Sequence, residues 1–166
     1  MAMLARWFGA LMGAMSIGAC DWIAQGELRP GESTGDDVRR LMGKPGMVWE
    51  EPDGSQVLEF ARGPEGHQTF MVEIGPDGRF RGMKNVLTSE FLARVRPGVT
   101  RDEARRILGQ PTEVTRFPLK PDQEVWTWRY QAEGRDPELF HARIGPDGVV
   151  LATESAPDPH DPRRGP

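Results

Sequence analysis

Apolar residues follow a helical spacing in two short stretches of the chain. In each stretch they fall at positions i, i+3 and i+4, which places them on one face of a helix. Each stretch begins at a threonine followed three residues later by an acidic residue, and each ends at a glycine with a proline two positions on. The pattern predicts two short helices, over residues 34–43 and 100–109. The apolar positions are Val38, Leu41 and Met42 in the first, and Ala104, Ile107 and Leu108 in the second.

After each helix the apolar period changes from 3.6 to 2. Apolar side chains alternate with more polar ones over residues 58–60, 70–74, 126–130 and 140–144, which is typical of half-buried strands. The apolar face of such strands needs cover, which helices on one side of an antiparallel sheet supply. We therefore expect an α+β fold of two-layer modules, each with short helices packed on one face of a three-stranded antiparallel sheet.

The chain repeats its own pattern. Residues 28–45 (LRPGESTGDDVRRLMGKP) match residues 95–111 (VRPGVTRDEARRILGQP), and Ile-Gly-Pro-Asp-Gly occurs at 74–78 and again at 144–148, an offset of 70. The pentapeptide suits a type I turn followed by a left-handed glycine, so it predicts a hairpin rather than a calcium loop. The repeat predicts tandem modules at residues 20–86 and 87–154. The Pro-rich segment 155–166 is expected to be a disordered tail.

The first twenty residues, MAMLARWFGALMGAMSIGAC, have the layout of a secretory signal. A single charge, at Arg6, precedes an uncharged stretch over residues 7–19 that is too short to cross a bilayer core. The end of the stretch, Ile17 to Cys20, resembles the lipobox of bacterial lipoprotein precursors. We expect residues 1–19 to be a signal peptide and Cys20, the only cysteine of the chain, to be lipidated.

Charge and composition exclude several classes of function. Lys and Arg number 21 against 25 Asp and Glu, so the basic excess needed to bind nucleic acid is missing. The three histidines, His67, His141 and His160, are isolated in the sequence, and neither a nucleophile elbow nor a phosphate-binding or dinucleotide-binding glycine motif occurs. We therefore expect no enzyme activity, no cofactor and no metal site.

The segment VLTSEFLARVRPGVTRDEARRILGQP, followed by the aromatic strand EVWTWRY, resembles the BamE family, also called SmpA/OmlA. The resemblance covers residues 87–130. It implies a small lipoprotein of the Gram-negative envelope that acts without enzyme activity in the machinery inserting β-barrels into the outer membrane, where it contacts other machinery subunits.

The duplication departs from that family, whose usual member carries one module. Two such modules in tandem are similar in layout to the β-lactamase inhibitor protein, which grips another protein. The expected function is thus a protein-binding accessory factor in outer-membrane β-barrel assembly or envelope integrity, and the alternative is a periplasmic inhibitory or binding module acting on another envelope protein. The chain would be lipid-anchored and face the periplasm. The resemblance favours the outer membrane, while Asp21 after the lipidated cysteine leaves the inner membrane open.

The candidate binding residues lie on the outward faces of the two expected sheets. With the aromatic positions inward, the outward positions are Val57, Glu59, Met71 and Glu73 in the first module and Thr127, Arg129, His141 and Arg143 in the second. At the offset of 70, Glu59 corresponds to Arg129 and Glu73 to Arg143, so the sign of the charge is reversed twice. Our hypothesis is that the two open faces form one surface, acidic on one side and basic on the other, that binds a partner by charge complementarity. The alternative is that these charges solvate an exposed sheet or pair across the junction between the modules.

Overall fold

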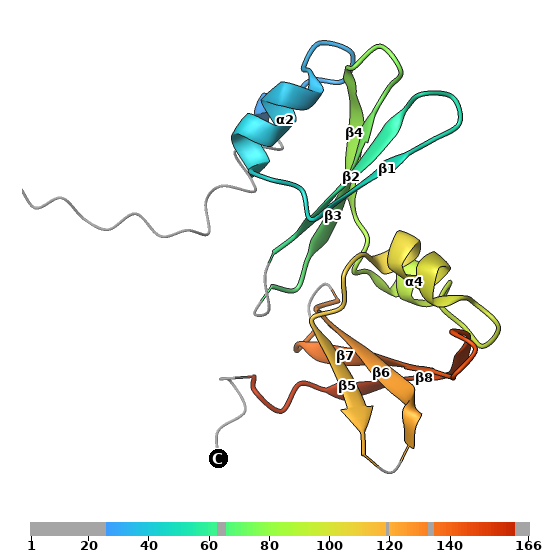
Figure 1. The fold of residues 1–166 in the computed structure, drawn as a ribbon. Coiled ribbons are helices and arrows are strands. Elements are labelled where there is room, and N and C mark those ends of the chain that lie inside the picture. Colours follow the sequence, from blue (N-terminus) through green and yellow to red (C-terminus); the bar gives the residue numbers. More distant parts are fainter. Residues whose placement is uncertain (1–25, 63–65, 119, 133–134, 162–166) are drawn as a thin grey trace, which may run out of the picture.

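The computed structural model describes residues 26–62, 66–118, 120–132 and 135–161, and over these ranges the fold is mostly β (Figure 1). It contains two four-stranded antiparallel sheets, and only 17% of the residues are helical. The expected α+β fold built on three-stranded sheets is therefore wrong. The predicted signal peptide and Cys20 lie outside the described residues.

The first module begins with a helix and continues as a meander of strands. Helix α2 spans Gly35–Met42, and the strands are β1 (Met47–Glu50), β2 (Gln56–Ala61), β3 (Thr69–Ile74) and β4 (Phe80–Asn85). The order in the sheet is β1-β2-β3-β4, so every strand pairs with its neighbours in sequence.

The second module repeats this order after an additional short helix. The helices are α3 (Ser89–Leu92) and α4 (Arg101–Leu108), and the strands are β5 (Glu113–Phe117), β6 (Lys120–Tyr130), β7 (Glu138–Ile144) and β8 (Val150–Pro157), in the order β5-β6-β7-β8. Strand β8 therefore runs into the segment expected to be a tail, and Asp158 and Asp161 beyond it are buried.

The strands that the sequence analysis missed are β1 and β5, the first edge strand of each sheet. Both are short, and their residues are exposed or only partly buried along the whole strand. An edge strand packs against one neighbour only, so its sequence need not alternate between apolar and polar residues. The period of 2 on which the strand prediction depended is weak there for that reason.

Local signals explain the ends of the helices and the hairpins. Thr34 and Thr100 each accept a hydrogen bond from the backbone N–H three residues on. Asp37 and Glu103 in turn accept one from the threonine N–H, so both helices have a complete capping box. The two Ile-Gly-Pro-Asp-Gly segments form the β3–β4 and β7–β8 turns, with Gly78 and Gly148 at positive φ. The hairpin prediction is confirmed.

Each module has a core between its helices and one face of its own sheet. In the first module Val38 and Met42 of α2 pack against Leu58, Phe60, Phe70 and Val72. In the second, Ala104 and Leu108 of α4 and Leu92 of α3 pack against Trp126, Trp128 and Phe140. Alternating strand residues supply these inner faces, as the aromatic positions of the sequence predicted.

The modules stack so that the helices of the second one lie between the two sheets. Figure 1 shows α2 on one side of the first sheet and α4 on the other side, above the second sheet. Helix α4 therefore contacts its own sheet with one face and the outer face of the first sheet with another. No helix within the described residues is long and apolar enough to cross a membrane.

The capping boxes give a test of the local account. Replacing Thr100 by Ala removes the acceptor for the Glu103 N–H, and we expect it to lower the free energy of unfolding by about 1 kcal/mol. Thr88 is the matched control, because it occupies the N-cap of α3 without a side-chain capping bond, and Thr88→Ala is expected to cost much less. Urea denaturation of the two variants measures the difference, and equal losses would contradict the account.

Candidate functional site

The carboxylate of Glu59 lies at the junction of the two modules. It is on the outer face of β2, and its side chain is fully buried. The backbone N–H of Gln110, just after α4, donates a hydrogen bond of 3.0 Å to Glu59 Oε1, and Arg105 Nε of α4 lies 3.9 Å from Oε2. One of the four predicted binding residues is therefore used to join the modules.

The residues after α4 fit this junction closely. Gly109 has a φ of 78°, which favours glycine, and a Cβ atom there would lie 2.6 Å from Thr69 Cγ2 of the first sheet. The Gly109 carbonyl accepts a hydrogen bond of 3.1 Å from the indole N–H of Trp128 in the second sheet. The end of α4 is thus hydrogen-bonded to one sheet through Gly109 and to the other through Gln110.

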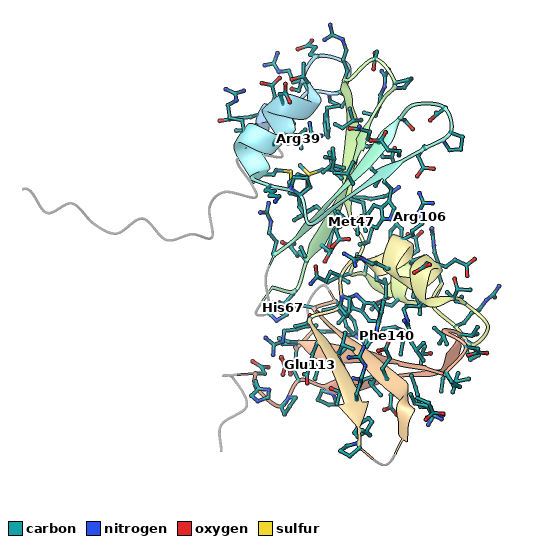
Figure 2. The ribbon with its side chains drawn as sticks, viewed as in Figure 1. Arg39, Met47, His67, Arg106, Glu113 and Phe140 are labelled. Atoms are coloured by element: carbon teal, nitrogen blue, oxygen red, sulfur yellow. The ribbon has the colours of Figure 1, made fainter. Side chains whose placement is uncertain are left out.

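Further ion pairs surround the buried contact. Arg106 of α4 pairs with Glu51, which follows β1, and Figure 2 shows Arg106 on the side of α4 that faces the first sheet. Glu73 pairs with Lys84 of β4 at 2.8 Å, and both side chains are half-exposed. They line a cavity of about 270 Å³ between the first sheet and helices α3 and α4. Glu73 therefore lies at the rim of the junction.

Arg129 is covered by the segment that follows β8. Its Nε atom lies 2.8 Å from Oδ2 of Asp158, and the two side chains are 12% and 3% exposed. Asp158 also accepts a hydrogen bond from the backbone N–H of His160. The C-terminal segment therefore packs against the outer face of the second sheet at this end.

Arg143 is the one predicted binding residue whose side chain remains available on an open surface. It is exposed on β7 and, within the described residues, forms no ion pair. It lines a hollow of about 480 Å³ on the outer face of the second sheet. The other lining residues are Phe117, Gln123, Val125, His141, Ala152, Thr153 and Glu154. We call this surface the outer hollow.

The outer hollow combines apolar and polar side chains. The ring of Phe117 is half-exposed at its rim, and Val125 and Ala152 supply further apolar surface. His141 Nδ1 lies 2.9 Å from the hydroxyl oxygen of Thr127, so the imidazole is oriented by a hydrogen bond. Among the described residues, no group of three or more His, Asp or Glu side chains is placed to hold a metal ion. The outer hollow therefore provides a concave surface with apolar side chains and a positively charged side chain.

The four predicted residues do not form one common surface. The outer face of the first sheet is covered by α3 and α4, and that of the second sheet is open at the outer hollow. Glu59 pairs across the junction, which is the alternative that the sequence left open, and Arg129 pairs with the C-terminal segment. Arg143 alone keeps the role of a candidate contact for a partner.

The residues that cover the first sheet were not predicted from the sequence: Arg105, Arg106, Gly109 and Gln110. A usable signal was present in the outward positions themselves. Met71 of the first module is apolar where His141 of the second is polar, and Met71 is 2% exposed. Apolar side chains on both faces of a strand indicate that both faces are covered.

The buried Glu59 should make stability depend on pH. Burial raises the pKa of the Glu59 carboxyl above its ordinary value of 4.5, although the Gln110 N–H and Arg105 act to lower it. Because the folded chain then holds the proton more tightly than the unfolded chain, stability is lost as the pH rises from 4.5 through the folded pKa.

We therefore expect Glu59→Gln, which cannot ionise, to gain stability relative to the wild type as the pH rises above 4.5. Denaturation of both proteins across this range measures the difference in unfolding free energy. A difference that stays constant with pH, or changes in the opposite direction, would contradict a buried carboxylate at the junction.

Comparison with known proteins gives little similarity. No protein-family model matches the chain, and no curated protein matches it. Among solved structures, the chain is similar to a DUF4309 family protein (YjgB) from Bacillus subtilis, with 17% sequence identity and a TM-score of 0.30. The match covers 84% of this chain and 93% of that chain. A likeness at this level supports no statement about fold or function.

Proposed function

We propose that the chain is a non-enzymatic, lipid-anchored envelope protein that binds other proteins as an accessory factor in outer-membrane β-barrel assembly or envelope integrity. The observation that supports binding most directly is the outer hollow. The helices α3 and α4 cover the outer face of the first sheet, whereas the corresponding region of the second sheet is open and carries the exposed Arg143 and Phe117.

The chemistry of the outer hollow favours recognition over catalysis. Aromatic rings and arginine are the side chains that contribute most often to protein–protein binding, and Phe117 and Arg143 lie at the same hollow. An arginine that is not already paired within the described part of the chain can bind a carboxylate of a partner without first giving up an ion pair there. Arg143 is therefore the residue on which we base the binding site.

The envelope part of the proposal is supported by the sequence. The signal-like residues 1–19 and Cys20 favour a lipid anchor, and the resemblance of residues 87–130 to the BamE family favours β-barrel assembly. The tandem modules favour the second candidate, a periplasmic inhibitory or binding module, because two such modules are not the usual arrangement in that family. Both candidates would use the outer hollow.

Cross-linking in native envelopes separates the two candidates. A photo-crosslinking residue in place of Ala152, inside the outer hollow, is expected to capture subunits of the β-barrel assembly machinery. Adding Arg143→Glu should lower that capture by about tenfold, equivalent to about 1.4 kcal/mol of binding free energy. Arg96→Glu, which reverses an exposed arginine on another surface, is the matched control and should leave capture unchanged.

Two other outcomes would change the proposal. Capture of a different envelope protein, still dependent on Arg143, would replace the assembly role by the inhibitory or binding role. Capture that is absent, or that does not respond to Arg143→Glu, would contradict the outer hollow as the binding surface.

A further inference from the structure

The chain itself contains an example of how an outer sheet face of this kind binds a helix. The outer face of the first sheet carries three acidic residues, and the part of the second module that covers it brings three arginines, one just after α3 and two on α4. The acidic residues are Glu51, Glu59 and Glu73, and the arginines are Arg94, Arg105 and Arg106. An apolar side chain, Ile107, lies among the arginines and faces the same cavity.

The outer hollow of the second sheet lies at the corresponding place. At the offset of 70, Met71 corresponds to His141, Glu73 to Arg143 and Lys84 to Glu154. Register confirms the equivalence, because Met71 is opposite Lys84 in the β3–β4 pair and His141 is opposite Glu154 in the β7–β8 pair. The positions that face α3 and α4 in the first module therefore line an open hollow in the second.

The charges at these positions are exchanged. Glu73 and Lys84 pair with each other in the first module, whereas Arg143 and Glu154 form no ion pair within the described part of the chain. Glu59, which faces Arg105, corresponds by strand register to the neutral Thr127 and not to Arg129, because Glu59 is opposite Met71 and Thr127 is opposite His141. A face that binds arginines in the first module thus presents an arginine in the second.

The exchange of charge works against one possible occupant of the outer hollow, which is helix α2 of another copy of the chain. It carries Arg39, Arg40 and Leu41 where α4 carries Arg105, Arg106 and Ile107, and Figure 2 shows Arg39 on α2, on the far side of the first sheet from Arg106. With acidic residues on the second sheet, α2 of another copy could dock there as α4 docks on the first sheet. Such contacts would be head-to-tail, the kind of contact that links copies into rings or open chains. The cationic Arg143 opposes them by repulsion.

We propose that the outer hollow receives a short helix of a partner protein that carries acidic side chains where α4 carries Arg105 and Arg106, and an apolar side chain at the place of Ile107. The apolar side chain enters the hollow beside Phe117 and Val125, and the carboxylates face Arg143. This inference rests on the proposal that the outer hollow is the binding surface, and it adds the structure and charge of the partner.

Substitutions that exchange charges test whether the outer hollow selects a helix by its charge. Helix α2 of the chain itself serves as the helix in this test. Arg143→Glu combined with Glu154→Lys gives these two positions the charges of Glu73 and Lys84 in the first sheet and leaves the net charge unchanged. This variant should associate head-to-tail through its native α2, whereas the wild type should not. Arg39→Glu combined with Arg40→Glu makes α2 acidic, and it should associate with the native outer hollow. Sedimentation velocity over a range of concentrations measures the self-association of each variant. We expect each variant to associate with an apparent Kd at least about tenfold tighter than that of the wild type.

A variant with all four substitutions would place an acidic α2 against an acidic outer hollow, and it should be a monomer. Arg29→Glu with Arg96→Glu is the matched control for Arg39→Glu with Arg40→Glu, since it gives the same change in net charge at other exposed positions and should leave the chain monomeric. The exchange at residues 143 and 154 alters exposed side chains only, so it tests the proposal even if the acidic α2 fails to fold.

Two results would overturn the inference. If both variants stay monomeric, the outer hollow does not accept a helix selected by charge. If the wild type already associates and Arg143→Glu abolishes this, the occupant is a second copy of the chain. Both readouts use purified protein, so a failure here would leave Arg143-dependent capture from envelopes, and with it the proposed function, unaffected.

Discussion

The end of helix α4 is the point on which the arrangement of the whole molecule depends. Gln110 donates its N–H to the buried carboxylate of Glu59 in the first sheet, while the Gly109 carbonyl accepts the indole N–H of Trp128 in the second. Glycine is required at 109 both by its positive φ and by the closeness of Thr69. Because these contacts are made on consecutive residues, one helix end fixes the position of both sheets. The outer face of the first sheet is covered as a result, and the second remains open.

This arrangement gives a physical reason for two buried charges on the outer faces. Each is opposite in sign to a group that packs against it from a later part of the chain: Glu59 meets Arg105, and Arg129 meets Asp158. Burying a charge without a partner is costly, so each of these two side chains needs the segment that covers it. Arg143 differs from both, because it is exposed and forms no ion pair within the described part of the chain. This is why its partner is sought outside the chain.

Much of the local structure could be predicted from the sequence, because the signals are local. Thr100 and Glu103 form the start of α4, the aromatic positions of β6 face the core, and Gly148 ends a hairpin turn. The edge strands β1 and β5 could not be predicted from periodicity, since they pack on one side only. Nor could the stacking of the modules, because Glu59 and Gln110 are 51 positions apart and nothing local marks them as partners. The candidate surface was consequently predicted on both sheets, whereas in the structure only the outer face of the second sheet is open.

The most direct test of the account is the protection of Met71 against oxidation. Met71 points away from the core of its own module and is 2% exposed only because the second module covers it, whereas Met42 lies in that core. Oxidation of methionine follows its exposure to solvent. The account predicts that mild peroxide treatment of the native protein, read by mass spectrometry, modifies Met71 as slowly as Met42. Oxidation of Met71 many times faster than that of Met42 would show that the modules do not stack, and would contradict the account.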